Sequence, residues 1–270
     1  MGGSLALALR GKCASLLGID PDPSAVKLAV ENQIVDFASS DPATLLPTAD
    51  IIILAAPVRT IISLLAQIPE IHPGPAVVID LGSTKEKIMN AMQSLPERFD
   101  PVGGHPICGK EKSSLAFAEG QLYHQAPFIF TSLPRTTPNA RLTAEQLALA
   151  VGAHPLWLDA LTHDRWVAAT SHFPTLLANA LAASTPLEAA PLTGPGFQSM
   201  TRLAVSSPEM MFDIFFTNKD NILSSLHSFQ KRLNQIETML ASGEFDQLKE
   251  LFIEGGERRE NIYGNKGTLQ

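Results

Sequence analysis

The chain has 270 residues and a formal net charge of −7, with 20 Lys and Arg residues scattered among 27 Asp and Glu. This balance disfavours a nucleic-acid surface, because phosphate binding relies on clustered cations. Hydrophobic residues make up 45% of the chain and charged residues 17%, which is too apolar for a disordered protein. The longest wholly apolar run, 51–58, is far shorter than the ~20 residues of a membrane helix. We therefore expect a folded protein that acts on a small molecule, without nucleic acid or membrane.

The cysteines and the N-terminal stretch bear on localisation. Cys13 and Cys108 lie far apart and match neither a metal-ligand spacing nor a redox pair. The apolar stretch 5–9 has no basic residue before it and is interrupted by Arg10 and Lys12, unlike a signal peptide. We therefore expect a cytoplasmic protein without a metal site.

Residues 1–160 alternate helical patterns with short apolar runs. This alternation is typical of a mainly parallel sheet with helices on both faces, the Rossmann-like doubly wound α/β fold. Open sheets of this kind bind ligands where their strands end. The expected strands are 14–19, 51–56, 76–81, 127–130 and 155–158.

Residues 161–270 lack strand signals and predict an all-helical C-terminal domain for substrate binding and dimerisation. Helical patterns cover about 162–184, 208–241 and 245–253. The second of these carries an apolar seam with spacings of four and three, which is either one face of an intrachain core or a dimer interface. The seam consists of Ile222, Leu226, Phe229, Leu233, Ile236 and Leu240.

The N-terminus resembles the second half of a dinucleotide-binding unit. Gly2 and Gly3 open a helix, and a strand ending at Asp20 follows. In the complete fingerprint the helix start faces the pyrophosphate and the acid binds the ribose hydroxyls, which favours NAD over NADP. The preceding strand and the first two glycines are absent, so we expect an incomplete pyrophosphate loop. The alternatives are a flexible terminus with a helix cap and, for Asp20, a turn residue before Pro21.

His105 is the strongest candidate for a catalytic group. A further short strand is expected to reach Gly103, and His105 follows it between Gly104 and Pro106, at the same sheet edge as the loop carrying Ser83. A histidine with an ordinary pKa of ~6.5 suits a group that accepts a proton near neutrality. A lone loop histidine is usually a surface residue, but the glycines, Ser83 and Glu111 nearby favour a functional interpretation.

Several motifs resemble those of the prephenate and arogenate dehydrogenases. They are Ala55-Ala56-Pro57, the segment 80–85 (DLGSTK), the segment 103–111 (GGHPICGKE), Ser171-His172-Phe173-Pro174, Gly196-Phe197 with Thr201-Arg202, and the stretch 208–218. The resemblance covers nearly the whole chain. It implies oxidative decarboxylation of a cyclohexadienol with NAD as hydride acceptor, and a homodimer formed through the helical domain.

The resemblance assigns roles by position. His105 accepts the hydroxyl proton, Ser83 places the hydroxyl against the nicotinamide, and Arg202 binds a substrate carboxylate, for which a planar guanidinium is well suited. Ala56 and Pro57 join Gly2, Gly3, Asp20 and Ser83 as cofactor-binding residues. Glu111 lies beside the site entrance or is a solvated loop carboxylate. His172 is a site donor or a histidine satisfied within its helix.

Thr175 marks a departure from the family pattern, because many prephenate-specific relatives carry a second histidine there. This departure removes a cationic or hydrogen-bonding group from the expected substrate pocket. The resemblance implies prephenate as the substrate, with arogenate as the alternative. A β-hydroxyacid or imine dehydrogenase has a similar two-domain plan but characteristically uses a catalytic lysine on the helix after the first domain. This class is disfavoured, because 161–184 contains no lysine. A third hypothesis is a dinucleotide-binding dimerisation module without catalysis.

His163 and Asp164 are interpreted as the first turn of a helix capped by Thr162. Nine residues separate His163 from His172, which places them on opposite faces of a regular helix. The sequence thus predicts that these two histidines do not share one pocket. Pro174 predicts a kink or a freed carbonyl in the same helix.

Overall fold

A computed structural model describes residues 1–109 and 114–264. The chain divides into two compact units, Met1–Lys219 and Asp220–Gln270, which are described separately. The domain boundary near residue 160, expected from the change of strands to helices, is a different division and stays a prediction. Glu111 lies outside the described residues.

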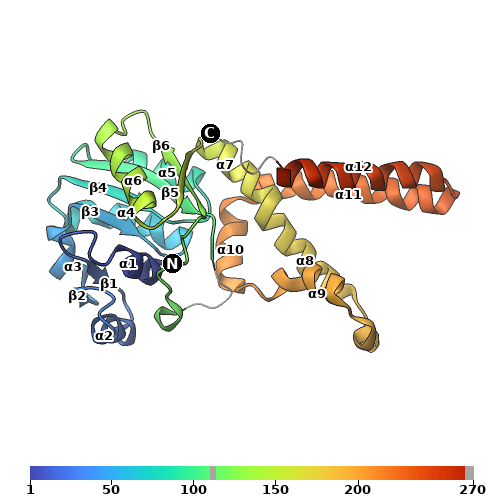
Figure 1. The fold of residues 1–270 in the computed structure, drawn as a ribbon. Helices are drawn as coiled ribbons and strands as arrows, with labels where there is room; N and C mark the ends of the chain where they lie inside the picture. Colours follow the sequence, from blue (N-terminus) through green and yellow to red (C-terminus); the bar gives the residue numbers. More distant parts are fainter. Residues whose placement is uncertain (110–113, 265–270) are drawn as a thin grey trace. The chain divides into compact units, whose positions relative to one another are not determined.

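A five-stranded sheet forms the centre of the first unit (Figure 1). Its order is β3 (Ile51–Leu54), β4 (Ala76–Asp80), β5 (Phe99–Pro106), β6 (Pro127–Ser132) and β7 (His154–Trp157). Only the β5–β6 pair is antiparallel. The predicted mainly parallel sheet is therefore confirmed.

Two further strands, β1 (Leu17–Ile19) and β2 (Phe37–Ser39), form a separate parallel pair. The sequence patterns missed β2, a three-residue strand too short to establish a periodicity. In the described part of the chain, no strand hydrogen-bonds the β1–β2 pair to the five-stranded sheet. Helix α1 (Gly2–Leu9) is the first element, as expected from the sequence.

Helices cover both faces of the main sheet, as the alternating pattern predicted. On one face, α1 and α6 (Pro138–Ala150) contribute Leu5 and Leu147 to a core that includes Phe128 and Phe130. On the other face lie α4 (Val58–Ile71) and α5 (Glu86–Gln93), whose apolar side chains pack on β4. The smaller elements are α2 (Pro23–Glu31), α3 (Pro42–Leu45), η1 (Leu46–Thr48) and η2 (Leu115–Phe117).

The helical segment after β7 begins with α7 (Ala160–Val167). Its N-cap is Asp159, whose carboxylate accepts a hydrogen bond from the Thr162 backbone N–H at 2.9 Å. The predicted Thr162 cap is therefore wrong, because the aspartate three residues earlier already satisfies that N–H.

The expected helix 162–184 is interrupted by a π-helical turn, η3 (Ala168–His172), before α8 (Phe173–Ser184). Pro174 has no N–H to donate to the Thr170 carbonyl, and the Phe173 N–H bonds instead to the Ala168 carbonyl. The chain continues through η4 (Leu187–Leu192), α9 (Pro195–Thr201), η5 (Arg202–Val205) and α10 (Pro208–Thr217).

The second unit is a pair of long helices, α11 (Lys219–Ser242) and α12 (Phe245–Gly264), drawn in orange and red in Figure 1. An ion pair between Arg232 and Glu254 joins them. The expected helix 208–241 is divided at Asn218, and α12 is longer than the predicted 245–253. Leu233 and Leu240 of the apolar seam remain about half exposed. Among the described helices, none has the length and apolar character needed to cross a membrane.

Candidate functional site

The site is built where β4 and β5 end. The parallel ladder between these strands stops at the pair Ile79 and Val102. Beyond it, two side chains bind the β5 backbone: Asp80 Oδ1 accepts from the Gly104 N–H at 3.0 Å, and Lys85 Nζ donates to the Gly104 carbonyl at 2.6 Å. Asp80 and Lys85 also form an ion pair with each other, and both side chains are fully buried. A buried side-chain pair thus holds the backbone directly before His105.

The two glycines of the segment leave room for this arrangement. A Cβ on Gly104 would lie 2.5 Å from the backbone oxygen of Asp80, and one on Gly103 would lie 2.5 Å from Met89 Sδ. Real Cβ atoms do not approach neighbours so closely. Gly103 and Gly104 therefore permit the close contact of β5 with α5 and with the end of β4.

The His105 ring contacts a second histidine that the sequence patterns did not assign to the site. His105 Nδ1 lies 2.9 Å from His163 Nε2, and the rings meet edge to face with centroids 5.1 Å apart. His163 Nδ1 lies 2.7 Å from Asp164 Oδ1. His163 and Asp164, which the sequence placed in an ordinary first helical turn, are thus buried behind His105. An adjacent His-Asp pair at a helix start is a weak signal, because such residues also serve as solvated caps.

Three hydrogen bonds anchor Asp164. Its Oδ1 accepts from the Lys85 N–H at 2.7 Å and its Oδ2 from the Glu86 N–H at 3.0 Å, at the N-terminus of α5. The Asn218 side chain donates to the Asp164 carbonyl at 2.7 Å. The Asp164 carboxylate is therefore fixed between the β4–α5 loop and the helical segment.

His172 joins the same cluster, which corrects the expectation that it and His163 lie on opposite faces. His172 Nδ1 lies 3.2 Å from the Asn218 amide nitrogen, and the His172 side chain is 1% exposed. The π-helical turn absorbs one extra residue, which rotates the following helix by roughly 100° relative to a regular α-helix. Burial lowers the pKa of His172 to about 4, against the attraction of the nearby Asp164 carboxylate.

Electrostatics favour a neutral His105. Burial holds its pKa well below the ordinary value, and its electrostatic interactions with His163, Lys85 and His172 lower this pKa further. The side chain nevertheless keeps a partly exposed surface. A neutral imidazole with an accessible edge can accept a proton from a bound molecule.

Ser83, Thr175 and Arg202 are the other described residues that the sequence predicted to act on the substrate. Ser83 is partly exposed in the β4–α5 loop, two residues before Lys85, at the sheet edge that carries His105. Thr175 is buried and its hydroxyl donates to the Ser171 carbonyl at 3.0 Å. Arg202 begins η5, which packs against α8, and its side chain is exposed. No contact that the described residues make joins Thr175 or Arg202 directly to His105.

Two of the predicted cofactor residues, Gly2 and Gly3, open α1, and two others, Ala56 and Pro57, follow the end of β3. A Cβ on Gly2 would lie 3.0 Å from Ala55 Cβ, so the start of α1 packs closely against the segment after β3. Ala56 and Pro57 come next, immediately before α4. Gly3 packs on η2, where its Cβ would lie 2.2 Å from Leu115 Cδ1. Glycine at these positions allows both approaches without a shift of Ala55 or of the Leu115 side chain.

Asp20 follows β1 and makes the turn that was the alternative interpretation. Its Oδ1 accepts from the Asp22 N–H at 2.9 Å. The side chain is exposed, so the turn leaves the carboxyl group accessible to a ligand. An acid beyond a strand end and a helix N-terminus formed by glycines are the groups that bind ribose and pyrophosphate.

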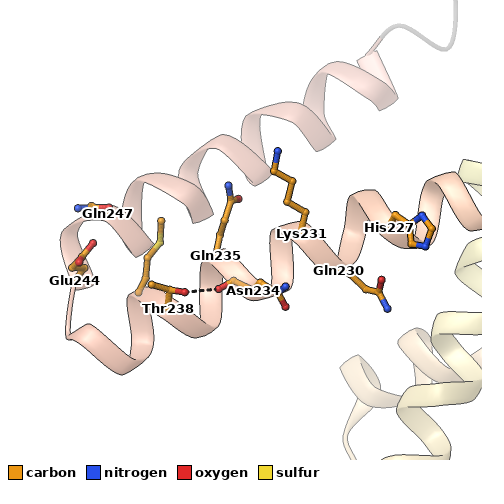
Figure 2. A pocket seen from close by; sticks show the side chains of 9 residues that line it. His227, Gln230, Lys231, Asn234, Gln235, Thr238, Glu244 and Gln247 are labelled. Carbon is orange, nitrogen blue, oxygen red and sulfur yellow. Dashed lines mark hydrogen bonds between the residues drawn. The ribbon is translucent and has the colours of Figure 1, made fainter.

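A groove of about 570 Å³ lies on the α11–α12 unit and is separate from these residues. Figure 2 shows polar side chains along it, including a Thr238 hydroxyl that donates to the Asn234 carbonyl. None of the residues predicted for the site lines it. Its lining is His227, Gln230, Lys231, Asn234, Gln235, Thr238, Met239, Glu244 and Gln247.

A mainly parallel α/β domain followed by helices is the architecture of a nucleotide-binding protein with a helical C-terminal domain. Two family models match this chain. The nucleotide-binding domain of prephenate dehydrogenase matches residues 5–156, and the prephenate dehydrogenase dimerization domain matches residues 159–254. The chain belongs to the prephenate dehydrogenase family.

Individual relatives agree with this membership. Prephenate dehydrogenase of Bacillus subtilis (strain 168) is 30% identical over 277 residues, covering 97% of this chain and 73% of the relative. A crystal structure of prephenate dehydrogenase from A. aeolicus, in complex with hydroxyphenyl propionate and NAD+, superposes with a TM-score of 0.88 at 30% identity, covering 97% and 94% of the two chains. Synechocystis arogenate dehydrogenase has a TM-score of 0.81 at 27% identity, covering 97% and 96%.

Proposed function

We propose that this chain is an NAD-dependent prephenate dehydrogenase of tyrosine biosynthesis, which converts prephenate to 4-hydroxyphenylpyruvate and carbon dioxide. The observation that carries the proposal is the neutral, partly exposed His105, held at the end of β5 by the Asp80–Lys85 pair and backed by His163. Family membership supplies the reaction to which such a base belongs.

His105 removes the proton of the ring hydroxyl. Loss of this proton pushes electron density from the oxygen towards the carbon that releases hydride, so the base assists the bond-breaking step. The ring carboxylate then leaves as carbon dioxide, and aromatisation drives the reaction. Ser83, at the same sheet edge, orients the hydroxyl, and Arg202 binds a substrate carboxylate.

The residues that precede the helices fit a dinucleotide. The start of α1, with Gly2 and Gly3, would face the pyrophosphate, and Asp20 would bind the ribose hydroxyls. Ala56, Pro57 and Ser83 would line the path towards His105. When bound, NAD supplies the hydride acceptor. The negative charge of Asp20 opposes a 2′-phosphate, which makes NADP the weaker cofactor.

Arogenate is a second candidate substrate, because Thr175 presents no cationic group. The Thr175 hydroxyl already donates a hydrogen bond to the Ser171 carbonyl, and the side chain carries no charge. Prephenate and arogenate differ in the side chain, which carries a keto group in one and an ammonium in the other. A steady-state assay with each substrate, which follows the absorbance of reduced cofactor, tests the proposal. Activity with neither substrate would overturn it.

The helical domain supports a homodimer. Several large apolar side chains on α11 and α12 are about half exposed or more in the single chain, as expected of a surface that a second copy covers. They are Leu233, Leu240, Phe245, Phe252, Ile253, Ile262 and Tyr263. Analytical ultracentrifugation tests this, and a monomer at micromolar concentration would contradict it. Both cysteines are free thiols, consistent with the cytoplasm as the proposed location.

A further inference from the structure

We infer that His163 and Asp164 are positioning residues, which hold His105 with its proton on Nδ1 so that Nε2 is the nitrogen that accepts the substrate proton. The inference rests on the proposed function, because it assigns the atom of His105 that performs the proposed step. It follows from a chain of contacts: Asp164 Oδ1 to His163 Nδ1 at 2.7 Å, and His163 Nε2 to His105 Nδ1 at 2.9 Å.

Asp164 sets the direction of the hydrogen bonds in this series of contacts. Each of its two carboxylate oxygens accepts a backbone N–H, from Lys85 and from Glu86. These donors lie at the N-terminus of α5, where the helix dipole stabilises negative charge. An ionised carboxylate can only accept hydrogen bonds. The hydrogen between Asp164 and His163 therefore belongs to His163 Nδ1.

A neutral imidazole carries one N–H, and its other nitrogen is an acceptor. With the proton of His163 on Nδ1, its Nε2 can only accept, so His105 Nδ1 must donate. The lone pair of His105 is then on Nε2. His163 is 1% exposed, so water does not compete for either of its nitrogens.

The groups that act electrostatically on His105 are Lys85 on the β4–α5 loop, His163 on α7 and His172 before α8, and together with burial they keep His105 neutral before the reaction. During the step, the substrate O–H bond breaks, its electron pair stays on oxygen, and the proton binds Nε2. The Nδ1–H of the resulting imidazolium keeps its bond to His163, behind which lies the Asp164 carboxylate.

Nuclear magnetic resonance of ¹⁵N-histidine-labelled full-length chain, without substrate and above neutral pH, reads the tautomer directly. Two-bond nitrogen–proton correlations distinguish protonated from bare ring nitrogens. The His105 signals are assigned by their loss in His105→Gln. We expect a protonated Nδ1 and a bare Nε2. A proton on Nε2 of His105 would overturn the inference.

Two variants test the positioning residues. In Asp164→Asn one acceptor oxygen becomes an N–H donor and the negative charge is lost, so the proton of His163 is no longer held on Nδ1 and His105 should lose its preference for a protonated Nδ1. We also expect kcat to fall by about 10- to 100-fold, within the contribution of a general base, with KM changed by less than about 3-fold. His163→Phe keeps the bulk and removes the acceptor, so both tautomers of His105 should become populated. It decides the question if Asp164→Asn does not fold.

Asp159→Asn is the matched control, because Asp159 caps the same helix and has no contact with His105. It should leave the tautomer and kcat unchanged. An unaltered His105 tautomer in both Asp164→Asn and His163→Phe would refute the positioning role. If the tautomer responds as expected but the unaltered chain turns over neither prephenate nor arogenate, the proposed function fails while the inferred chain of contacts stands.

Discussion

Lys85 Nζ donates a hydrogen bond to the carbonyl oxygen of Gly104, the residue immediately before His105, at 2.6 Å. The same ammonium is paired with Asp80, whose carboxylate accepts the Gly104 N–H. Both polar groups of the Gly104 peptide unit are thus bound by one buried ion pair. The orientation of His105 therefore depends on side chains that lie outside the GGHP segment.

Replacement of the lysine should show this dependence. Lys85→Met leaves Asp80 buried without its cation, and we expect a loss of about 3–5 kcal/mol in the free energy of unfolding, measured with urea. The double variant with Asp80→Asn should recover part of that loss, since no unpaired charge remains. Neither variant should regain normal kcat, because neither holds the Gly104 carbonyl. A Lys85→Met chain as stable as the unaltered one would contradict this account.

The glycines make a second, steric prediction. Gly104→Ala puts a Cβ against the Asp80 backbone, which cannot move without shifting β4. We expect destabilisation of about 1–3 kcal/mol together with a lower kcat. Gly109→Ala is the control, because among residues 1–109 and 114–264 nothing lies within 4 Å of its Cβ position. Equal thermal stability of the two variants would contradict the close-contact argument.

A third prediction concerns His105 itself. His105→Asn should lower kcat by about 100-fold or more and leave KM nearly unchanged, since the base acts on the transition state rather than on substrate binding. Steady-state kinetics with prephenate measure both constants. Unchanged turnover would remove His105 from the mechanism.

The sequence predicted β3 and β4, because both are continuous apolar runs that end in loops of small or polar residues. It also predicted that Ser83 and His105 share one sheet edge, because parallel strands place their carboxyl ends together. It missed the cluster of His163, Asp164 and His172. That cluster depends on a π-helical turn, which changes the helix register by one residue, and on tertiary contacts that no periodicity encodes.

The ion pair behind His105 was hidden for a different reason. Asp80 and Lys85 are five residues apart in a loop, and nothing in their spacing shows that both side chains turn inward to bind Gly104. Charged residues are rarely fully buried, so the expectation from sequence alone is a solvated loop. The structure instead makes them the support of the site.

His172 leads to a prediction on pH. Its pKa is about 4 in the folded chain, mainly because of burial, and ~6.5 when unfolded. Below pH ~6.5 the unfolded state therefore binds a proton at His172 that the native state does not bind. This contribution to stability is fully present above pH ~6.5 and is lost as pH falls towards 4, by about 3 kcal/mol. Urea unfolding at several pH values measures it.

The matched pair for this prediction is His172→Gln and His227→Gln. His227 lies exposed on α11, so its replacement should leave the pH profile unchanged. His172→Gln should flatten the profile between pH 4 and about 6.5, since the residue no longer titrates. Identical profiles in the two variants would assign the acid sensitivity to other groups.

The last prediction concerns the cofactor and separates an enzyme from a dinucleotide-binding module without catalysis. Isothermal titration should give a saturable heat with NAD and a weaker one with NADP, because the exposed Asp20 carboxylate opposes the 2′-phosphate. Asp20→Ser should weaken NAD binding and reduce the preference for it. Asp22→Ser is the control, because Asp22 caps α2. No saturable heat with either nucleotide would show that α1 and the strand ends do not suffice to hold the pyrophosphate. A saturable heat without turnover would instead favour the non-catalytic module.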